Sequence, residues 1–107
     1  MGYTIWPDGP TGDVVREVYE ERTRQETKWG EQNHEREVYF TILAEEFGEV
    51  AKEVVELHAY NGPTGAVAYR DRMKNLRTEL IQTAAVAVAM IECLERNNVW
   101  LYHPERL

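Results

Sequence analysis

Cysteine is nearly absent from this chain: Cys93 is the only one in 107 residues, so no disulfide can form within it. A lone thiol fits a reducing compartment, and the cytoplasm is the expected location. Because Cys93 lies between Ile91 and Leu94, we expect a buried helical thiol, with a nucleophile as the alternative. Long apolar runs are lacking too. The longest, Ala84 to Ile91, is far short of the roughly 20 residues of a membrane-spanning helix, so neither a span nor a signal peptide is predicted.

Positive charge is also scarce. Twelve Lys and Arg stand against nineteen Asp and Glu, which gives a formal net charge of −7. Polymeric nucleic acid is therefore not an expected partner, because phosphate contacts need clustered Lys and Arg. A small phosphorylated ligand remains compatible, since a bound metal ion can reverse the local field. The length predicts a single domain over residues 1–107, small enough that oligomerisation would help to stabilise it.

Strand patterns are missing, whereas helical patterns fill most of the chain, and we predict an all-α fold. An irregular arm over residues 1–12 precedes a first helix from Val14 to about Trp29, capped by Asp13 or Thr11 and ended by Gly30. A polar connector follows. The helical core extends over residues 14–97, and residues 98–107 form a tail whose Trp100 and Tyr102 we expect to pack on the core or on a partner.

Two further helices complete the prediction. The second runs from about Arg36 to Tyr60, and its core stripe consists of Leu43, Phe47, Val50, Val54 and Leu57. A turn over residues 61–65 contains Thr64 as a cap for the third helix, which runs from about Ala66 to Asn97. Residues 83–91 of this helix are apolar on every side and must be covered on every side. Three helices can hardly do that alone, so a partner subunit is inferred.

Two helical pairs of acidic or amide side chains carry the functional prediction. Glu46 and Glu49 have i,i+3 spacing, as have Glu79 and Gln82, so each pair shares one helix face. Counted at about 100° per residue, Glu46, Glu53 and Glu49 lie beside the core stripe, with Glu45 further round. Carboxylates crowded at a core edge repel one another unless they share a proton or a cation, and oxygen ligands suit Mg²⁺.

A solvated acidic face is the alternative interpretation, since glutamate is a good helix former. Two details favour the site. Only Lys52 interrupts the five glutamates over residues 45–56 with positive charge, and Gly48 stands among them at a cost of about 1 kcal/mol against Ala. A glycine here is explained if another backbone or a ligand must come close.

Other residues are candidates for binding a ligand. Lys74 and Arg77 belong to a short basic stripe with Arg70, which forms either salt bridges to glutamates or a clamp for phosphate. In the connector, Trp29 and His34 either pack and cap, or Trp29 stacks on a base whose edge bonds to Asn33 and His34.

These motifs match a family pattern. The segment Glu45-Glu46-Phe47-Gly48-Glu49, an Asn-Gly-Pro turn and Glu79-Leu80-Ile81-Gln82 resemble the EExxE and ExxD motifs of the MazG-type all-α nucleoside triphosphate pyrophosphohydrolases. The segment from Arg22 to His34, with Arg24-Gln25 and Lys28-Trp29-Gly30-Glu31-Gln32-Asn33-His34, resembles a MazG-like subgroup common in actinobacteria and their phages. The segment from Glu79 to Ala89 resembles the same subgroup. The likeness covers roughly residues 14–97.

The resemblance implies a helical bundle that assembles as a homodimer or homotetramer. It implies catalytic Glu46, Glu49 and Glu79, with Mg²⁺ (or Mn²⁺) held by these three and with Glu45 nearby. It also implies cleavage of a nucleoside triphosphate to the monophosphate and pyrophosphate. Lys74 and Arg77 are then candidates for steadying the phosphates, and Trp29, Asn33 and His34 for binding the substrate.

Gln82 departs from the family pattern, which has Asp there. An amide oxygen can ligate Mg²⁺ but adds no charge and is a poor base, so metal affinity should fall; Glu53 is a candidate substitute ligand. The alternative function is a catalytically impaired helical module for nucleotide binding or protein interaction. A di-iron carboxylate bundle expects Glu-x-x-His pairs, whereas His58 follows Glu56 by two residues and not by three.

Overall fold

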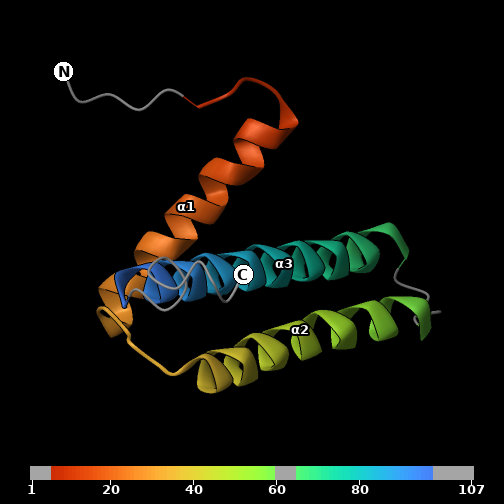
Figure 1. Cartoon of the computed structure of the whole chain (residues 1–107). Coiled ribbons are helices and arrows are strands. Elements are labelled where there is room, and N and C mark those ends of the chain that lie inside the picture. Colours follow the sequence, from red (N-terminus) through yellow and green to blue (C-terminus); the bar gives the residue numbers. More distant parts are fainter. Residues whose placement is uncertain (1–5, 60–64, 98–107) are drawn as a thin grey trace, which may run out of the picture.

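The chain folds into three helices, as predicted. The computed structural model describes residues 6–59 and 65–97, and all regular structure within these ranges is helical. The elements are α1 (Pro10–Trp29), α2 (Arg36–Ala59) and α3 (Gly65–Arg96). Figure 1 shows α2 and α3 antiparallel and side by side, while α1 crosses the carboxyl-terminal half of α3. Helix α3 is thus the central element, with α1 and α2 packed against it.

Helix α1 begins earlier than predicted. Its first residue is Pro10, whose ring holds φ near the helical value and whose missing N–H needs no partner there. Gly9 precedes it with φ 94°, and its carbonyl accepts a hydrogen bond of 3.1 Å from the Asp13 N–H. The predicted side-chain cap by Asp13 or Thr11 is therefore wrong. Asp13 lies in the first turn instead, where its carboxylate faces the positive end of the helix dipole.

The remaining helix ends lie within one residue of the positions predicted from the sequence. Gly30, at φ 74°, ends α1 and donates its N–H to the Glu26 carbonyl at 2.7 Å. Asn97 ends α3, with its N–H and its side-chain Nδ2 both donating to the Cys93 carbonyl, at 3.0 and 2.8 Å. The predicted turn over residues 61–64, with Thr64 as a cap, and the tail with Trp100 and Tyr102 lie outside the described residues.

The core of one subunit is small. Its buried apolar residues in the described ranges are Tyr39, Val50, Ala85, Val86, Ala89 and Cys93. Burial of Cys93 confirms the expected buried thiol. The predicted stripe on α2 is only partly correct: Val50 is buried and Leu43 and Leu57 are half-buried, but Phe47 and Val54 are exposed. Helix α3 covers only part of this wide stripe, and Phe47 and Val54 face outward.

Exposed apolar side chains form two further rows, which we call the outer apolar face. Its members are Phe40, Phe47 and Val54 on α2 and Met73, Leu80 and Ile91 on α3. At about 100° per residue, each row stays within about 40° along its helix. On α2 the row lies on one side of buried Val50 and Glu46 lies on the other. The radius of gyration is 17.3 Å, against about 13 Å for a compact domain of this length, so the single chain is open.

Glycine has opposite roles at two helical positions. Gly12 is buried, and a Cβ built there would lie 1.6 Å from the Pro7 carbonyl oxygen, so only glycine lets residues 6–9 approach α1. Gly48 is exposed, and a Cβ built there meets nothing within 4 Å. The close approach expected at Gly48 is therefore not made by the described part of this chain.

We expect Gly48→Ala to stabilise the protein by about 1 kcal/mol, because alanine loses less backbone entropy in a helix and no neighbour obstructs its methyl group. Urea unfolding followed by circular dichroism measures the change. Gly12→Ala is the matched control and should lower stability through its clash with Pro7. Destabilisation by Gly48→Ala would contradict open space at this position and point to a second molecule close to it.

Candidate functional site

The predicted acids of α2 and α3 lie close enough to influence one another's ionisation. Glu46 is half-buried, and its pKa is raised above the ordinary value, first by burial and then by the negative charges of Glu79 and Glu49. Glu45 and Glu21 add smaller contributions in the same direction. The i,i+3 pair on α2 and the first acid of the pair on α3 therefore belong to one negative region, as their spacing suggested.

Glu79 and Glu53 extend this region. Burial raises the pKa of Glu79, and the charges of Glu49 and Glu53 raise it further. The Oε2 atom of Glu53 is buried and has no hydrogen-bond partner among the described residues. A desolvated carboxylate oxygen without a donor is costly unless a cation or a proton compensates it. Its position beside Glu79 makes Glu53 a suitable additional ligand for a hard cation.

The carboxylates of this region are chemically suited to bind a divalent cation, but they are not arranged as a complete set of ligands. Carboxylate oxygens are the ligands that Mg²⁺ prefers, and these carboxylates need a compensating charge. Within residues 6–59 and 65–97, however, no group of three or more His, Cys, Asp or Glu side chains is arranged to hold a metal ion. Ligation would thus require the side chains of Glu46, Glu49 and Glu79 to turn toward a common point.

Gln82 faces α1. It is half-buried and lines a cavity of about 180 Å³ between α1 and α3, together with Glu21, Arg24 and Arg77. The Arg24 guanidinium lies 2.5 Å from Glu21 Oε1 on the same wall. The amide that replaces the family's aspartate therefore adjoins an ion pair of α1, a neighbour that the two-helix motif did not predict.

Among the described residues, the ion pair of the basic stripe is directed to α1 rather than to the acids of α2. Arg77 binds Glu17 of α1 through two contacts, Nη1 to Oε1 at 2.8 Å and Nη2 to Oε2 at 2.5 Å. These hydrogen bonds hold the pKa of Glu17 below its ordinary value. Lys74 is exposed and lines an apolar groove with Arg70 and Leu80. In this subunit Arg77 acts as a salt bridge between helices, the alternative that the sequence left open.

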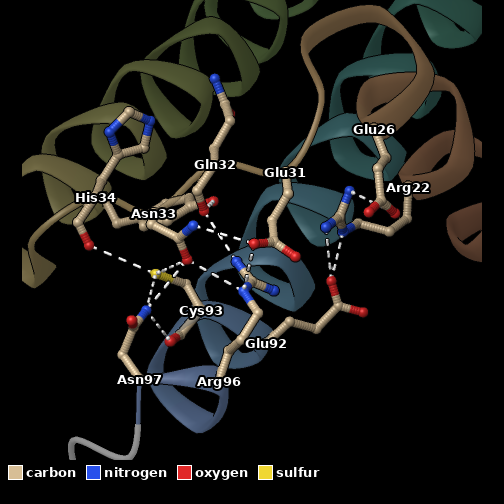
Figure 2. A network of polar contacts seen from close by, with 11 residues as sticks. Arg22, Glu26, Glu31, Gln32, Asn33, His34, Glu92, Cys93, Arg96 and Asn97 are labelled. Carbon is tan, nitrogen blue, oxygen red and sulfur yellow. Dashed lines mark hydrogen bonds and ion pairs between the residues drawn. The ribbon is translucent and has the colours of Figure 1, made fainter.

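Asn33 and His34 tie the connector to the end of α3 (Figure 2). Asn33 Oδ1 accepts hydrogen bonds from Arg96 Nε at 3.1 Å and from Asn97 Nδ2 at 3.2 Å. The Cys93 thiol donates to the His34 carbonyl at 3.5 Å. The His34 ring packs edge-on against Tyr39, with ring centroids 5.0 Å apart. The structure thus gives both residues packing roles and does not bring them to the acids.

Arg22 forms the other half of this network. Its guanidinium donates from Nε to Glu92 Oε1 at 2.8 Å, and its Nη1 lies 3.8 Å from Glu26 Oε2 (Figure 2). Only 12% of the Arg22 side chain is exposed. Because a buried charge needs such partners, the Arg22–Glu92 pair helps to fix the position of α1 across α3, while Glu26 of α1 itself adds a second negative charge beside Arg22.

A cavity of about 220 Å³ adjoins Glu46. Of the predicted site residues only Glu46 and Trp29 line it. The other lining residues are Arg22, Gln25 and Gly30 from α1 and its end, Gln32 from the connector, Tyr39 and Ile42 from α2, and Val86 and Ala89 from α3. Trp29 is 55% exposed, and the ammonium of Lys28 lies 4.9 Å from its ring centroid.

Sequence reasoning missed the contribution of α1 to this site. Glu21, Arg22 and Gln25 fall in the polar stretch 20–28, which lacks an apolar stripe that would show which face is inward. The signal was present in the i,i+4 spacing of Glu21 and Gln25, which places them on one face.

The ionisation of Glu46 gives a prediction about stability. Its pKa is raised above the ordinary value of 4.5, so charging it opposes folding. Its contribution to stability is fully present below pH 4.5 and is lost as pH rises through the folded pKa. We expect Glu46→Gln to raise the melting temperature of the metal-free protein by a few degrees at pH 8 and scarcely at all at pH 4. Differential scanning calorimetry at both pH values measures this, and an equal gain at both would contradict an origin in ionisation.

Three comparisons with known proteins, a scan of family models, a search of curated proteins and a search of solved structures, returned no match. The described helices include none that is long and apolar enough to cross a membrane.

Proposed function

We propose that this chain is a cytoplasmic, Mg²⁺-dependent nucleotide pyrophosphohydrolase that converts a nucleoside triphosphate to the monophosphate and pyrophosphate. One observation carries the proposal: Glu46, Glu49 and Glu79 of facing helices form one negative region beside a cavity with aromatic walls. Such a region needs a cation, and a cavity of this kind suits a base.

Glu46, Glu49 and Glu79 would hold the metal, with Glu53 and Glu45 close by. When bound by these residues, Mg²⁺, or Mn²⁺ in its place, would supply positive charge against the phosphate oxygens and would make a water more acidic. The carboxylates of this region would orient the attacking water, and one that is not bound to the metal would accept its proton. The water oxygen would form a bond to the α phosphorus while the bond from that phosphorus to the oxygen bridging to the β phosphate breaks, so that the monophosphate and pyrophosphate are released.

A panel of ribo- and deoxyribonucleoside triphosphates tests the proposal. Purified protein is incubated with each nucleotide in the presence of Mg²⁺, Mn²⁺ or excess chelator, and pyrophosphate and monophosphate are quantified together. We expect equal amounts of both products from at least one nucleotide and none with chelator. If no nucleotide of the panel yields pyrophosphate with either metal, the proposed activity is refuted.

A second candidate is a helical module that binds nucleotide or protein without catalysis. Two observations favour it: Gln82 adjoins the Glu21–Arg24 pair, and Arg77, a candidate phosphate ligand, is already bound to Glu17. Isothermal titration with Mg²⁺ and a non-hydrolysable nucleotide separates the candidates. Binding without turnover supports the nucleotide-binding module, and binding of neither ligand supports a protein-interaction module.

We also propose that a second copy of the chain covers the outer apolar face. The exposed Phe47 and Leu80 and the large radius of gyration support this assembly. Because the acids lie on the other side of α2 from this face, association would leave the cavity beside Glu46 open to a ligand.

A further inference from the structure

The cavity beside Glu46 has the character of a site for a flat ring. Tyr39, Ile42, Val86 and Ala89 supply apolar surface, and Trp29 stands half-exposed at its edge. Its volume of about 220 Å³ lies above the roughly 150 Å³ that accommodates benzene and below the range of pockets for drug-sized ligands. A single heterocyclic base with its substituents matches this size, whereas a whole nucleotide does not.

Most polar groups of the cavity are already bonded. Arg22 is neutralised by Glu92 and Glu26, and the Tyr39 hydroxyl donates to the Gln32 carbonyl at 3.3 Å. Arg22 is thus not a free cation that would select an anion. The cavity is better suited to a neutral group than to a phosphate.

Gln25 is oriented by its neighbour. Its Nε2 donates to Glu21 Oε2 at 3.3 Å. Since a carboxylate only accepts hydrogen bonds, this contact fixes which end of the amide is nitrogen and leaves the carbonyl Oε1 at the other end. Gln25 is half-buried and lines the cavity, so its carbonyl oxygen remains as an acceptor for a ligand bound there. The N–H groups on the edge of a nucleobase are the complementary donors.

We propose that this cavity is the nucleobase subsite and that Gln25 is its specificity-determining residue, accepting a hydrogen bond from the edge of the base. The inference rests on the proposed function for its substrate class. With the base in the cavity, the lining residue Glu46 marks the direction of the phosphates. Helix α1, which lies outside the acidic motifs, thus contributes Gln25 to a subsite whose other walls come from α2 and α3.

The test separates recognition of the base from binding of phosphate and metal. Affinities for an α,β-methylene nucleoside triphosphate and for inorganic tripolyphosphate, both with Mg²⁺, are measured by isothermal titration for wild type and Gln25→Met. We expect the variant to bind the nucleotide analogue about tenfold more weakly, the usual consequence of removing a hydrogen-bonding partner. Its affinity for tripolyphosphate should be unchanged. Thr27→Met, an exposed position on the same helix, is the control and should match wild type in both.

Circular dichroism spectra of the variants confirm that their helix content is equal. Unchanged affinity of Gln25→Met for the analogue, or an equal loss for both ligands in a folded variant, would overturn the assignment of Gln25. If the wild type releases no pyrophosphate but Gln25→Met still binds the analogue more weakly than the wild type does, the proposed hydrolase activity is refuted and the nucleobase subsite is supported.

Discussion

Glu49→Gln is expected to lower Mg²⁺-dependent pyrophosphate release by at least about 100-fold, because it removes a charged ligand from a site that depends on charge. The structure singles out Glu49 since it is the carboxylate that raises the pKa values of both Glu46 and Glu79. Glutamine has nearly the same shape, so the loss would be electrostatic. Initial rates at several Mg²⁺ concentrations measure it, and excess metal should restore part of the activity.

The same substitution has a second readout. Removing the Glu49 charge should lower the pKa values of Glu46 and Glu79 in the metal-free protein, which NMR titration of the side-chain carboxyl groups can follow. Glu95→Gln is the matched control, since Glu95 is exposed near the end of α3. Equal pyrophosphate release by wild type and Glu49→Gln would remove the catalytic assignment of this acidic region.

Phe47→Glu is expected to weaken self-association at least about 30-fold, the effect of losing an interface residue that contributes 2 kcal/mol or more. Phe47 is 64% exposed in the middle of the α2 row, between Phe40 and Val54. A carboxylate introduced there would be desolvated by any helix that covers the row. Sedimentation velocity over a range of protein concentrations measures the association.

Val38→Glu provides the control for this experiment. Val38 is exposed on the same helix, but at about 100° per residue it points about 180° away from Phe47. It should leave association unchanged. A wild-type chain that sediments as a monomer at all concentrations, or equal effects of the two substitutions, would contradict the second copy on the outer apolar face.

The helices were predictable from sequence because their signals are local. Gly30 ends α1, and the apolar spacing on α2 defines that helix without reference to the rest of the chain. The start of α1 was missed because Pro10 was read as part of an irregular arm, although proline at the first helical position is favourable. The exposure of Phe47 was missed because spacing shows which face is apolar but not how many helices cover it.

The site was predictable only in its acidic part. The i,i+3 pairs placed Glu46, Glu49 and Glu79 correctly in one region, since a hairpin of two long helices brings such faces together. Long-range contacts decided the rest. Arg77 pairs with Glu17 across 60 positions in sequence, and Gln25 reaches the cavity through the packing of α1. Neither partner can be derived from spacing within one helix.

The arrangement of the helices has a consequence for the order of folding. The α2–α3 hairpin joins neighbouring segments, whereas α1 is held to α3 by pairs such as Arg22–Glu92, 70 residues apart. Loop closure over that separation costs more entropy, so the hairpin is expected to form first and α1 to dock last. The acids of α2 and α3 thus come together early, and the wall of the cavity that contains Gln25 is completed in the final step.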